Sequence, residues 1–242
     1  MMPRMNYVMM VGILFLSACA GEHVDASSSA KADYQHAQEL MDTQNYARAT
    51  IFLEKFSSKH PYSEYATEAE LLRVDAAYGD EEYILSETLA LRFLKRHPRH
   101  PRLAYVRYML AMSYVHESGA LERDQVATHH AVDALKDVLK YASDSEYAEH
   151  SRQYLQKMLN KLAAHEVYVG KFYFDHERYV AAANRFQVVL NDYQITPSIE
   201  EGLYYLAASY KQLHLEAQAK EIVTLLTYNY PQSVWREKAD TL

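Results

Sequence analysis

The sequence predicts an all-α protein, a right-handed superhelix of about five helical hairpins, and three observations support this prediction. The 242 residues include only six Gly and six Pro, which leaves little material for the tight turns of a β-sandwich or barrel. From residue 32 onward, apolar residues recur at i, i+3, i+4 and i+7, the period of a helix with one buried face. Proline occurs almost only between these helical segments, where it ends a helix.

The first segment of the chain, residues 1–18, is predicted to be a signal peptide. Arg4 precedes an apolar run that is too short and too one-sided for a stable transmembrane span. The run ends in Leu16-Ser17-Ala18-Cys19, which matches the lipobox of bacterial lipoproteins, where the cysteine sulfur receives a diacylglycerol. The alternative is an ordinary signal peptide followed by a chance cysteine. Because Cys19 is the only cysteine, intrachain disulfides and thiolate zinc clusters are excluded.

Residues 19–31 are predicted to form the lipidated cysteine and a short flexible tether, because they include three consecutive serines. Ala20 follows the cysteine, in place of the aspartate that commonly retains lipoproteins in the inner membrane. We therefore expect the protein to be anchored by lipid to the outer membrane, on its periplasmic face.

Two distant segments share one internal register, in which small residues precede a proline by 24 and 12 positions. The residues that share this register are Ala37, Ala49 and Pro61 in the first segment, and Ala207, Ala219 and Pro231 in the last. This is the tetratricopeptide pattern, a pair of antiparallel helices in about 34 residues. The small residues let the two helices approach closely, and the proline ends the second helix.

A third copy of the register contains Gly170, Tyr173, Ala182 and Phe186, although Gln194 stands where the proline is expected. Further helices are predicted at residues 68–78, 83–95, 103–114 and 132–141, and one long helix at 146–174. Residues 116–129 exceed the usual length of a repeat connection and are predicted to be an insertion loop between hairpins at 32–115 and at 130–242. The alternative is an irregular bundle, which would bury the tyrosines in one central core rather than along a regular path.

The sequence carries none of the motifs that would predict an enzyme. The nucleophile elbow, the phosphate-binding loop and the dinucleotide fingerprint are all absent, and the twelve histidines lack metal-ligand spacing. We therefore expect no catalytic residue, metal, cofactor or small-molecule substrate. A net charge of −7 argues against nucleic acid as a partner. The enzyme alternative is a hydrolase with two carboxylates roughly 5 to 9 Å apart.

One basic run, residues 92–102, is predicted to be a capped and solvated helix end, because cations favour the carboxyl end of a helix. The alternative is contact with a partner or with phospholipid headgroups. The 22 tyrosines suggest a protein-binding groove, because tyrosine offers a large rigid apolar face and one hydroxyl. Tyr173 and Tyr210 are assigned to the core of their repeats.

Several short motifs, taken in order, resemble one known family. They are Asn45-Tyr46-Ala47-Arg48-Ala49, His60-Pro61-Tyr62-Ser63-Glu64-Tyr65, His97-Pro98-Arg99-His100-Pro101, Asn184-Arg185 and Asp192-Tyr193. Together with the lipobox and the five hairpins, they make the chain similar to the BamD (ComL) family of outer-membrane assembly lipoproteins. The resemblance implies a subunit of the β-barrel assembly machinery whose partners are BamA, other lipoproteins of the machinery and unfolded outer-membrane proteins.

The resemblance also implies two binding surfaces. The hairpins at 32–115 would receive segments of unfolded outer-membrane proteins, with candidate contacts at Tyr46, Arg48, Tyr62 and Tyr65. The hairpins at 130–242 would hold the periplasmic domains of BamA, with candidate contacts at Arg185, Asp192 and Tyr193. The alternative function is that of another periplasmic tetratricopeptide lipoprotein, such as a coordinator of cell-wall synthesis.

Overall fold

A computed structural model of the chain describes residues 26–242, so the predicted signal peptide and Cys19 lie outside the described residues. The described residues form helices and contain no strand. The helices are α1 (Ala26–Asp42), α2 (Tyr46–Lys59), α3 (Ala66–Gly79), α4 (Tyr83–Arg96), α5 (Leu103–Glu117), α6 (Val126–Tyr141), α7 (Ala148–Asp175), α8 (Tyr179–Asp192), α9 (Ile199–Gln212), α10 (Glu216–Asn229) and α11 (Val234–Ala239).

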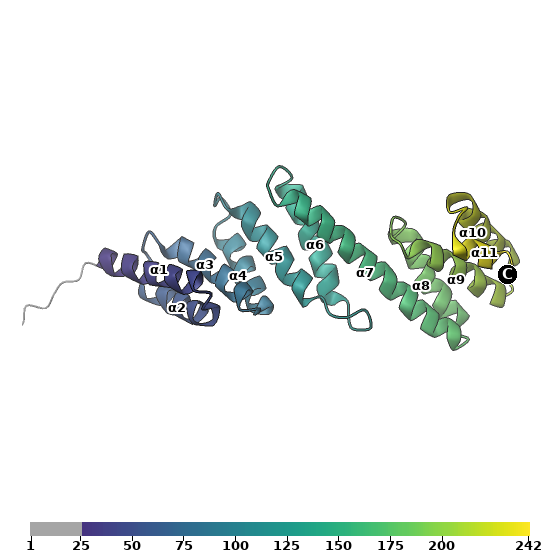
Figure 1. Cartoon of the computed structure of the whole chain (residues 1–242), viewed down its shortest axis with the longest axis horizontal. Helices are drawn as coiled ribbons and strands as arrows, with labels where there is room; N and C mark the ends of the chain where they lie inside the picture. Colours follow the sequence, from purple (N-terminus) through teal and green to yellow (C-terminus); the bar gives the residue numbers. More distant parts are fainter. Residues whose placement is uncertain (1–25) are drawn as a thin grey trace, which may run out of the picture.

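The helices pair into five hairpins that stack in chain order, α1 with α2 through α9 with α10. Each helix up to α10 packs against the next one in sequence, and the stack extends in one direction from α1 to the carboxyl terminus (Figure 1). The short helix α11 packs against α9 and covers the last hairpin. The prediction of an all-α superhelix of about five hairpins is therefore confirmed.

Small residues bring the paired helices together where the repeat pattern predicts them. Gly170 of α7 is buried, and a Cβ atom placed on it would lie 2.5 Å from Cε1 of Phe186 in α8. Ala182, at the start of the same contact, is fully buried. The Phe186 ring therefore fills the space that a methyl group on residue 170 would occupy, and this contact sets the alignment of α7 and α8.

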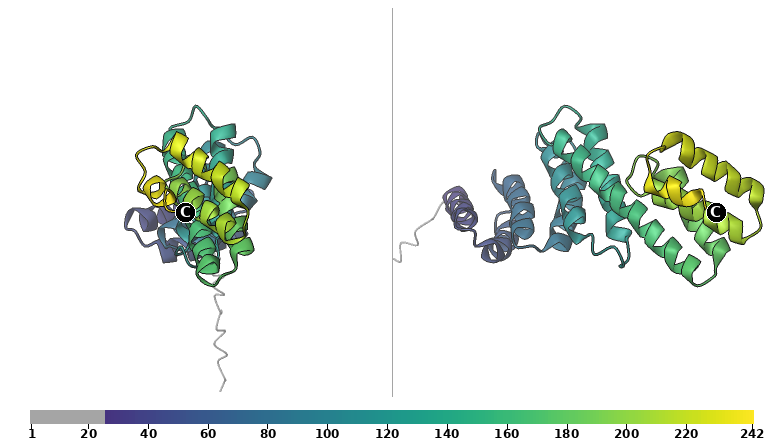
Figure 2. Two further views of the ribbon diagram at one scale, coloured as in Figure 1. Left: turned by 90° about the vertical axis from the view of Figure 1, so that its right-hand side faces the viewer. Right: turned by 45° about the vertical axis from the view of Figure 1, so that its right-hand side comes forward.

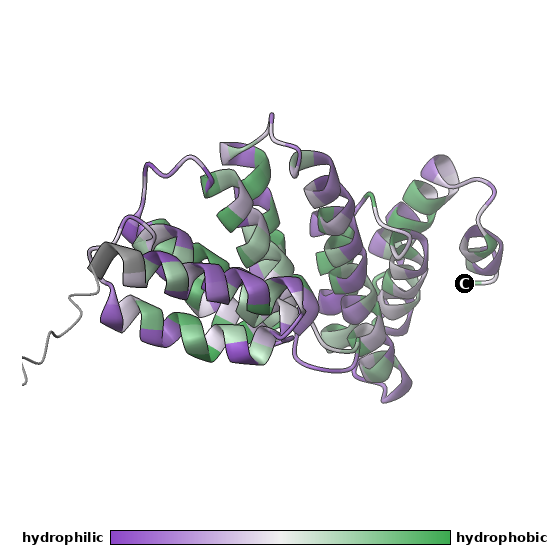
Figure 3. Ribbon diagram, turned by 60° about the vertical axis from the view of Figure 1, so that its left-hand side comes forward, coloured by the Kyte–Doolittle hydropathy of each residue, from purple (hydrophilic) through white to green (hydrophobic). Residues whose placement is uncertain are grey.

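The hydrophobic core is divided along the stack and has no single centre. One cluster joins the first hairpin to α3, a second joins the second hairpin to α5, and a third extends from α5 to α11. Each helix carries apolar residues on one side and polar residues on the other (Figure 3). This division is the arrangement of a repeat protein, in which each unit is stabilised by its neighbours.

The first helices of successive hairpins form one face of the stack. Besides their sequence neighbours, α3 contacts α5, α5 contacts α7, and α7 contacts α9. Among the described helices, the second helices of the hairpins make no contact of comparable extent with one another. The first helices therefore lie on the inner, concave side of the superhelix. The first helix of the fourth hairpin, α7, runs obliquely beside the third hairpin (Figure 2).

The prediction of a flexible tether is wrong for residues 26–31, which belong to α1. Ala30 is 1% exposed and begins an apolar stripe that continues through Tyr34, Ala37 and Leu40 onto the first hairpin. The helical period of this stripe extends the helix back through the serines. Residues 19–25 of the predicted tether lie outside the described residues.

The predicted insertion loop is shorter than 116–129, because α5 ends at Glu117 and α6 begins at Val126. Thr128 is fully buried, and its hydroxyl donates to the Gln125 side chain at 2.8 Å. The Gln125 amide in turn donates to three backbone carbonyls of the loop. This network starts the helix before residue 130 and closes the connection at residues 118–125.

The remaining loop is attached to α7. The Lys161 ammonium donates to the Ser118 carbonyl at 3.0 Å and also bonds the Gly119 carbonyl, while the His165 ring lies 2.7 Å from the Leu121 carbonyl. The long helix predicted at 146–174 is confirmed as α7, with 28 residues. This helix packs on both α6 and α8, so it joins the third and fourth hairpins.

Candidate functional site

Tyrosines follow the concave face of the stack from α1 to α7. Each is half-buried and comes from a first helix or from the residue directly before one. The set consists of Tyr34, Tyr65, Tyr78, Tyr105, Tyr108, Tyr147 and Tyr154, and we call the surface that they line the tyrosine groove. The tyrosines thus follow a regular path across hairpins, as a superhelix predicts and a bundle does not.

Two stacked ring pairs repeat along the groove. Tyr65 stacks on Tyr34 with ring centroids 5.2 Å apart, and Tyr147 stacks on Tyr108 with centroids 5.0 Å apart. Both pairs have an interplanar angle of 23°. Each pair joins a tyrosine that directly precedes one first helix to a tyrosine of the preceding first helix. The stacked pairs therefore bridge neighbouring hairpins as well as line the groove.

The rings continue onto α7. The His150 ring centroid lies 5.7 Å from that of Tyr108 and 4.8 Å from that of Tyr154, and Lys157 lies over the Tyr154 ring. Burial, with the hydroxyls of Tyr108 and Tyr154 nearby, raises the pKa of Tyr78 to about 12. The Tyr78 hydroxyl therefore stays protonated at neutral pH and acts as a neutral hydrogen-bonding group of the groove.

One carboxylate lies among these rings. Asp75 of α3 accepts a hydrogen bond from the Tyr105 hydroxyl at 2.7 Å. The Arg102 guanidinium lies 4.7 Å from the centre of the Tyr105 ring and 3.5 Å from the Glu68 carboxylate. Burial raises the pKa of Asp75 to about 6, against the opposing effects of the Tyr105 hydrogen bond and the Arg102 charge. The groove therefore contains a charged group at neutral pH beside its aromatic wall.

Two predicted substrate contacts lie together at the edge of the first hairpin. Tyr62 and Tyr65 line a pocket of about 360 Å³ formed by residues 59–65. Tyr62 is 99% exposed, while Tyr65 is held against Tyr34. The turn is set by Ser63, whose hydroxyl accepts from the backbone N–H of Tyr65 at 3.0 Å. The pocket therefore opens beside the first stacked pair of the groove.

The other two predicted substrate contacts lie elsewhere. Tyr46 and Arg48 stand at the start of α2, about 20 Å along the helix from the residues of the pocket. The Tyr46 ring packs against Gly79 at the end of α3, where an added Cβ would lie 2.8 Å from it. Arg48 is exposed. The structure thus separates the four candidates into two places and gives Tyr46 a packing role between hairpins.

The predicted BamA contacts differ in exposure. Arg185 of α8 forms an ion pair with Glu166 of α7 at 3.1 Å and remains partly accessible. Asp192 is exposed at the end of α8. Tyr193 is only 9% exposed and belongs to the large hydrophobic cluster. The Tyr193 ring therefore packs inside the protein, and only the first two residues offer surface to a partner.

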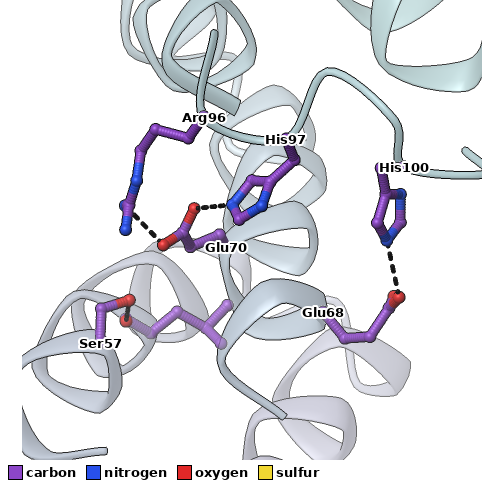
Figure 4. A network of polar contacts seen from close by, with 7 residues as sticks. Ser57, Glu68, Glu70, Arg96, His97 and His100 are labelled. Atoms are coloured by element: carbon purple, nitrogen blue, oxygen red, sulfur yellow. Dashed lines mark hydrogen bonds and ion pairs between the residues drawn. The ribbon is translucent and has the colours of Figure 1, made fainter. Parts of the chain in front are cut away.

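The basic residues at the ends of α2 and α4 are held by acidic residues of their own hairpins. Asp33 accepts from Lys59 at 2.7 Å and lies 2.8 Å from the His60 ring nitrogen. Glu70 repeats this arrangement 37 residues later: it accepts from Arg96 at 2.6 Å and lies 3.0 Å from His97. Figure 4 shows Arg96 and His97 directed at Glu70.

Much of the predicted basic run therefore consists of paired residues. His100 and Arg102 approach Glu68 at 3.4 and 3.5 Å, while Lys95 and Arg99 are exposed. Residues 26–242 contain no group of three His, Cys, Asp or Glu side chains that could hold a metal ion. Within the same range, every helix is too short or too polar to cross a membrane.

A repeated sequence motif marks Tyr147, a residue of the groove that was not among the predicted contacts. Ser-Glu-Tyr-Ala occurs twice, at residues 63–66 and 145–148, each time directly before a first helix. In each copy the serine N–H donates to a carbonyl three residues before it, and the tyrosine forms a stacked pair. Comparison of the two copies would have identified Tyr147 as the counterpart of Tyr65.

Comparison with known proteins extends over most of the chain. A family model described as outer membrane lipoprotein, YfiO, matches residues 26–226. The outer membrane protein assembly factor BamD of Rickettsia prowazekii is 32% identical over 196 residues, which cover 81% of this chain and 78% of that protein. The factor of the same name from Neisseria meningitidis serogroup B is 30% identical over 237 residues, covering 91% of this chain and 89% of the relative.

Among solved structures, the tetratricopeptide-like repeats of a kinesin light chain from Podosopora anserina superpose with a TM-score of 0.43 at 12% identity, covering 91% of this chain and 100% of that chain. The family model covers most of the described residues, and its match agrees with the resemblance that the sequence motifs carried. The chain therefore belongs to the YfiO family of outer membrane lipoproteins, whose curated relatives are named outer membrane protein assembly factor BamD.

Proposed function

We propose that the protein is a non-catalytic scaffold of the machinery that assembles β-barrel proteins in the outer membrane. The observation that carries this proposal is the tyrosine groove, in which aromatic rings recur along the concave side of a hairpin stack. Such grooves bind extended or helical segments of other proteins. The names of the relatives support outer-membrane protein assembly as the setting, rather than the coordination of cell-wall synthesis.

The chemistry of the groove suits segments of unfolded outer-membrane proteins. Their strands alternate apolar and polar residues and carry aromatic girdles. Half-buried tyrosine rings offer apolar faces to the apolar side chains, and their hydroxyls can bond the backbone of the segment. The exposed Tyr62 and the pocket beside it extend this surface at the first hairpin.

The hairpins at 130–242 supply the second surface of the proposed scaffold. Arg185 and Asp192 are its accessible polar candidates for the periplasmic domains of BamA. Tyr168 and Phe172, 47% and 56% exposed on the second half of α7, add an apolar patch near a pocket of about 410 Å³. An apolar patch bordered by polar residues is the usual composition of a protein interface.

The proposed anchor is a lipid on Cys19, which would place the scaffold on the periplasmic face of the outer membrane. The lipobox supports this proposal, because diacylglycerol addition requires a cysteine directly after the small residues. With Cys19 seven residues before α1, the hairpin stack would lie close to the membrane surface.

A photo-crosslinking residue in place of Tyr108 is expected to capture unfolded outer-membrane proteins in cells. The matched control is Ile84, which is 69% exposed on α4, a second helix of its hairpin. If simple exposure decided capture, the more exposed Ile84 position would crosslink more strongly. Equal or stronger capture at Ile84 would contradict the assignment of the groove.

A Tyr108→Ala variant is expected to raise the Kd for a barrel segment about tenfold, a loss of about 1.4 kcal/mol in binding free energy.

A further inference from the structure

Asp75 differs from the other acidic residues of the groove in what surrounds it. It lies on the concave face of α3 and is half-buried between the second and third hairpins. Its Oδ1 accepts from the Tyr105 hydroxyl at 2.7 Å, which joins α3 to α5. The groups that face it are Glu68 of its own helix, Arg102 and Tyr105 of the third hairpin, Tyr34 of the first hairpin and Tyr147 before α7.

The Tyr105 ring also contacts the start of the fourth hairpin. Its centroid lies 5.6 Å from that of Tyr147, which stacks on Tyr108. The Arg102 guanidinium covers the Tyr105 ring and is itself held by Glu68. A change in the hydrogen bond to Asp75 therefore acts on a ring that contacts Tyr147 and, through Tyr147, Tyr108.

The charge on Asp75 costs stability at neutral pH. Burial raises the pKa of its carboxyl from 3.8 to about 6, so the folded protein binds this proton more tightly than the unfolded chain does. The contribution of this group to stability is full below the unfolded pKa and falls as the pH rises through the folded pKa. A buried carboxylate retained at such a cost is a candidate for a functional role.

We propose that Asp75 is a positioning residue of the tyrosine groove. By accepting the Tyr105 hydrogen bond, its carboxylate fixes the Tyr105 and Tyr147 rings in place before a segment arrives. A preformed groove avoids the entropic cost of ordering these side chains on binding. This inference rests on the proposed binding of barrel segments in the groove. A charged acceptor holds the hydroxyl more strongly than a neutral one does.

The test replaces Asp75 with asparagine, which keeps the shape and an acceptor oxygen but removes the charge. The probe is a fluorescein-labelled synthetic peptide of about ten residues, with the alternating aromatic and polar pattern of one barrel strand. Fluorescence anisotropy with the full mature chain is expected to show a Kd about fivefold higher for Asp75→Asn at neutral pH. The wild-type affinity is expected to rise with pH around the pKa of about 6, whereas the variant profile stays flat.

Thermal unfolding separates this role from a structural one. Asp75→Asn is expected to melt at the same temperature as the wild type or higher at neutral pH, because it removes a buried charge. Tyr105→Phe keeps the ring but loses the donor, and it is expected to reproduce the weaker binding and the flat pH profile. The matched control is Asp80→Asn, an exposed carboxyl at the end of the same helix, which is expected to bind as the wild type does.

Three results would overturn the inference. Wild-type affinity and an unchanged pH profile in Asp75→Asn would overturn it while leaving the proposed function in place. Weaker binding that accompanies a lower melting temperature, without any change in the pH profile, would assign Asp75 to folding alone. Failure of the wild type to bind the peptide at any pH would overturn the proposed function, and the inference with it.

Discussion

Replacement of the buried Phe186 by alanine is expected to lower the free energy of unfolding by about 3–5 kcal/mol. The ring is fully buried between α7 and α8, and it stacks on Tyr205 with centroids 5.5 Å apart. Its loss removes apolar contacts and leaves a cavity at the point where the two helices approach closest. Urea unfolding followed by circular dichroism measures the effect, and a loss below about 1 kcal/mol would contradict the packing described for this hairpin.

Gly170→Ala tests the same contact from the other helix. In an exposed helix this change stabilises by about 1 kcal/mol, because glycine is a poor helix former. Here the new methyl group would lie 2.5 Å from the Phe186 ring, so we expect a loss of about 1–3 kcal/mol instead. The control is Gly119→Ala, whose methyl group would lie 3.4 Å from the flexible Arg123 side chain, an ordinary contact, so its stability is expected to stay within about 0.5 kcal/mol of the wild type. Combining Gly170→Ala with Phe186→Leu is expected to recover part of the loss.

Replacement of Cys19 by serine is expected to move the protein from the membrane fraction to the soluble fraction. Each buried methylene of an acyl chain contributes about 0.8 kcal/mol, so several chains on one cysteine dominate membrane affinity. Cell fractionation after a high-salt wash measures the change, since the wash removes proteins held only by charge.

The matched control for this prediction is Ala20→Ser, which introduces the same side chain one residue later and is expected to leave the protein with the membranes. Circular dichroism of Cys19→Ser is expected to match the wild type, because residue 19 precedes α1. Retention of Cys19→Ser in washed membranes would contradict the proposed lipid anchor and assign the attachment to another segment or to a partner.

The sequence was sufficient to predict the hairpins because their determinants are local. Proline positions and small residues at fixed distances reflect contacts within a single hairpin, such as the one between Gly170 and Phe186. The long helix α7 was predictable for the same reason, because residues 146–174 contain no proline. Errors occurred at the ends of elements, where a few buried side chains such as Ala30 and Thr128 extend a helix into polar sequence.

The binding surface was harder to predict, because it depends on how hairpins stack. Tyr108 and Tyr147 lie 39 residues apart in the sequence, and only the curvature of the stack brings their rings together. Tyr193 illustrates the opposite error, since a motif position compatible with exposure proves to be buried once α8 and α9 pack. The predicted boundary at residues 116–129 also divides the groove, whose last rings come from residues beyond it.

The long helix α7 gives the molecule a mechanical property. Its 28 residues form a rod about 42 Å long. Tyr154 near one end belongs to the tyrosine groove, while Glu166 toward the other end forms an ion pair with Arg185. Because one continuous helix carries both residues, a change in the position of α7 at one surface is felt at the other. The loop at residues 118–125 is hydrogen-bonded to Lys161 and His165, which lie between these two residues in the sequence.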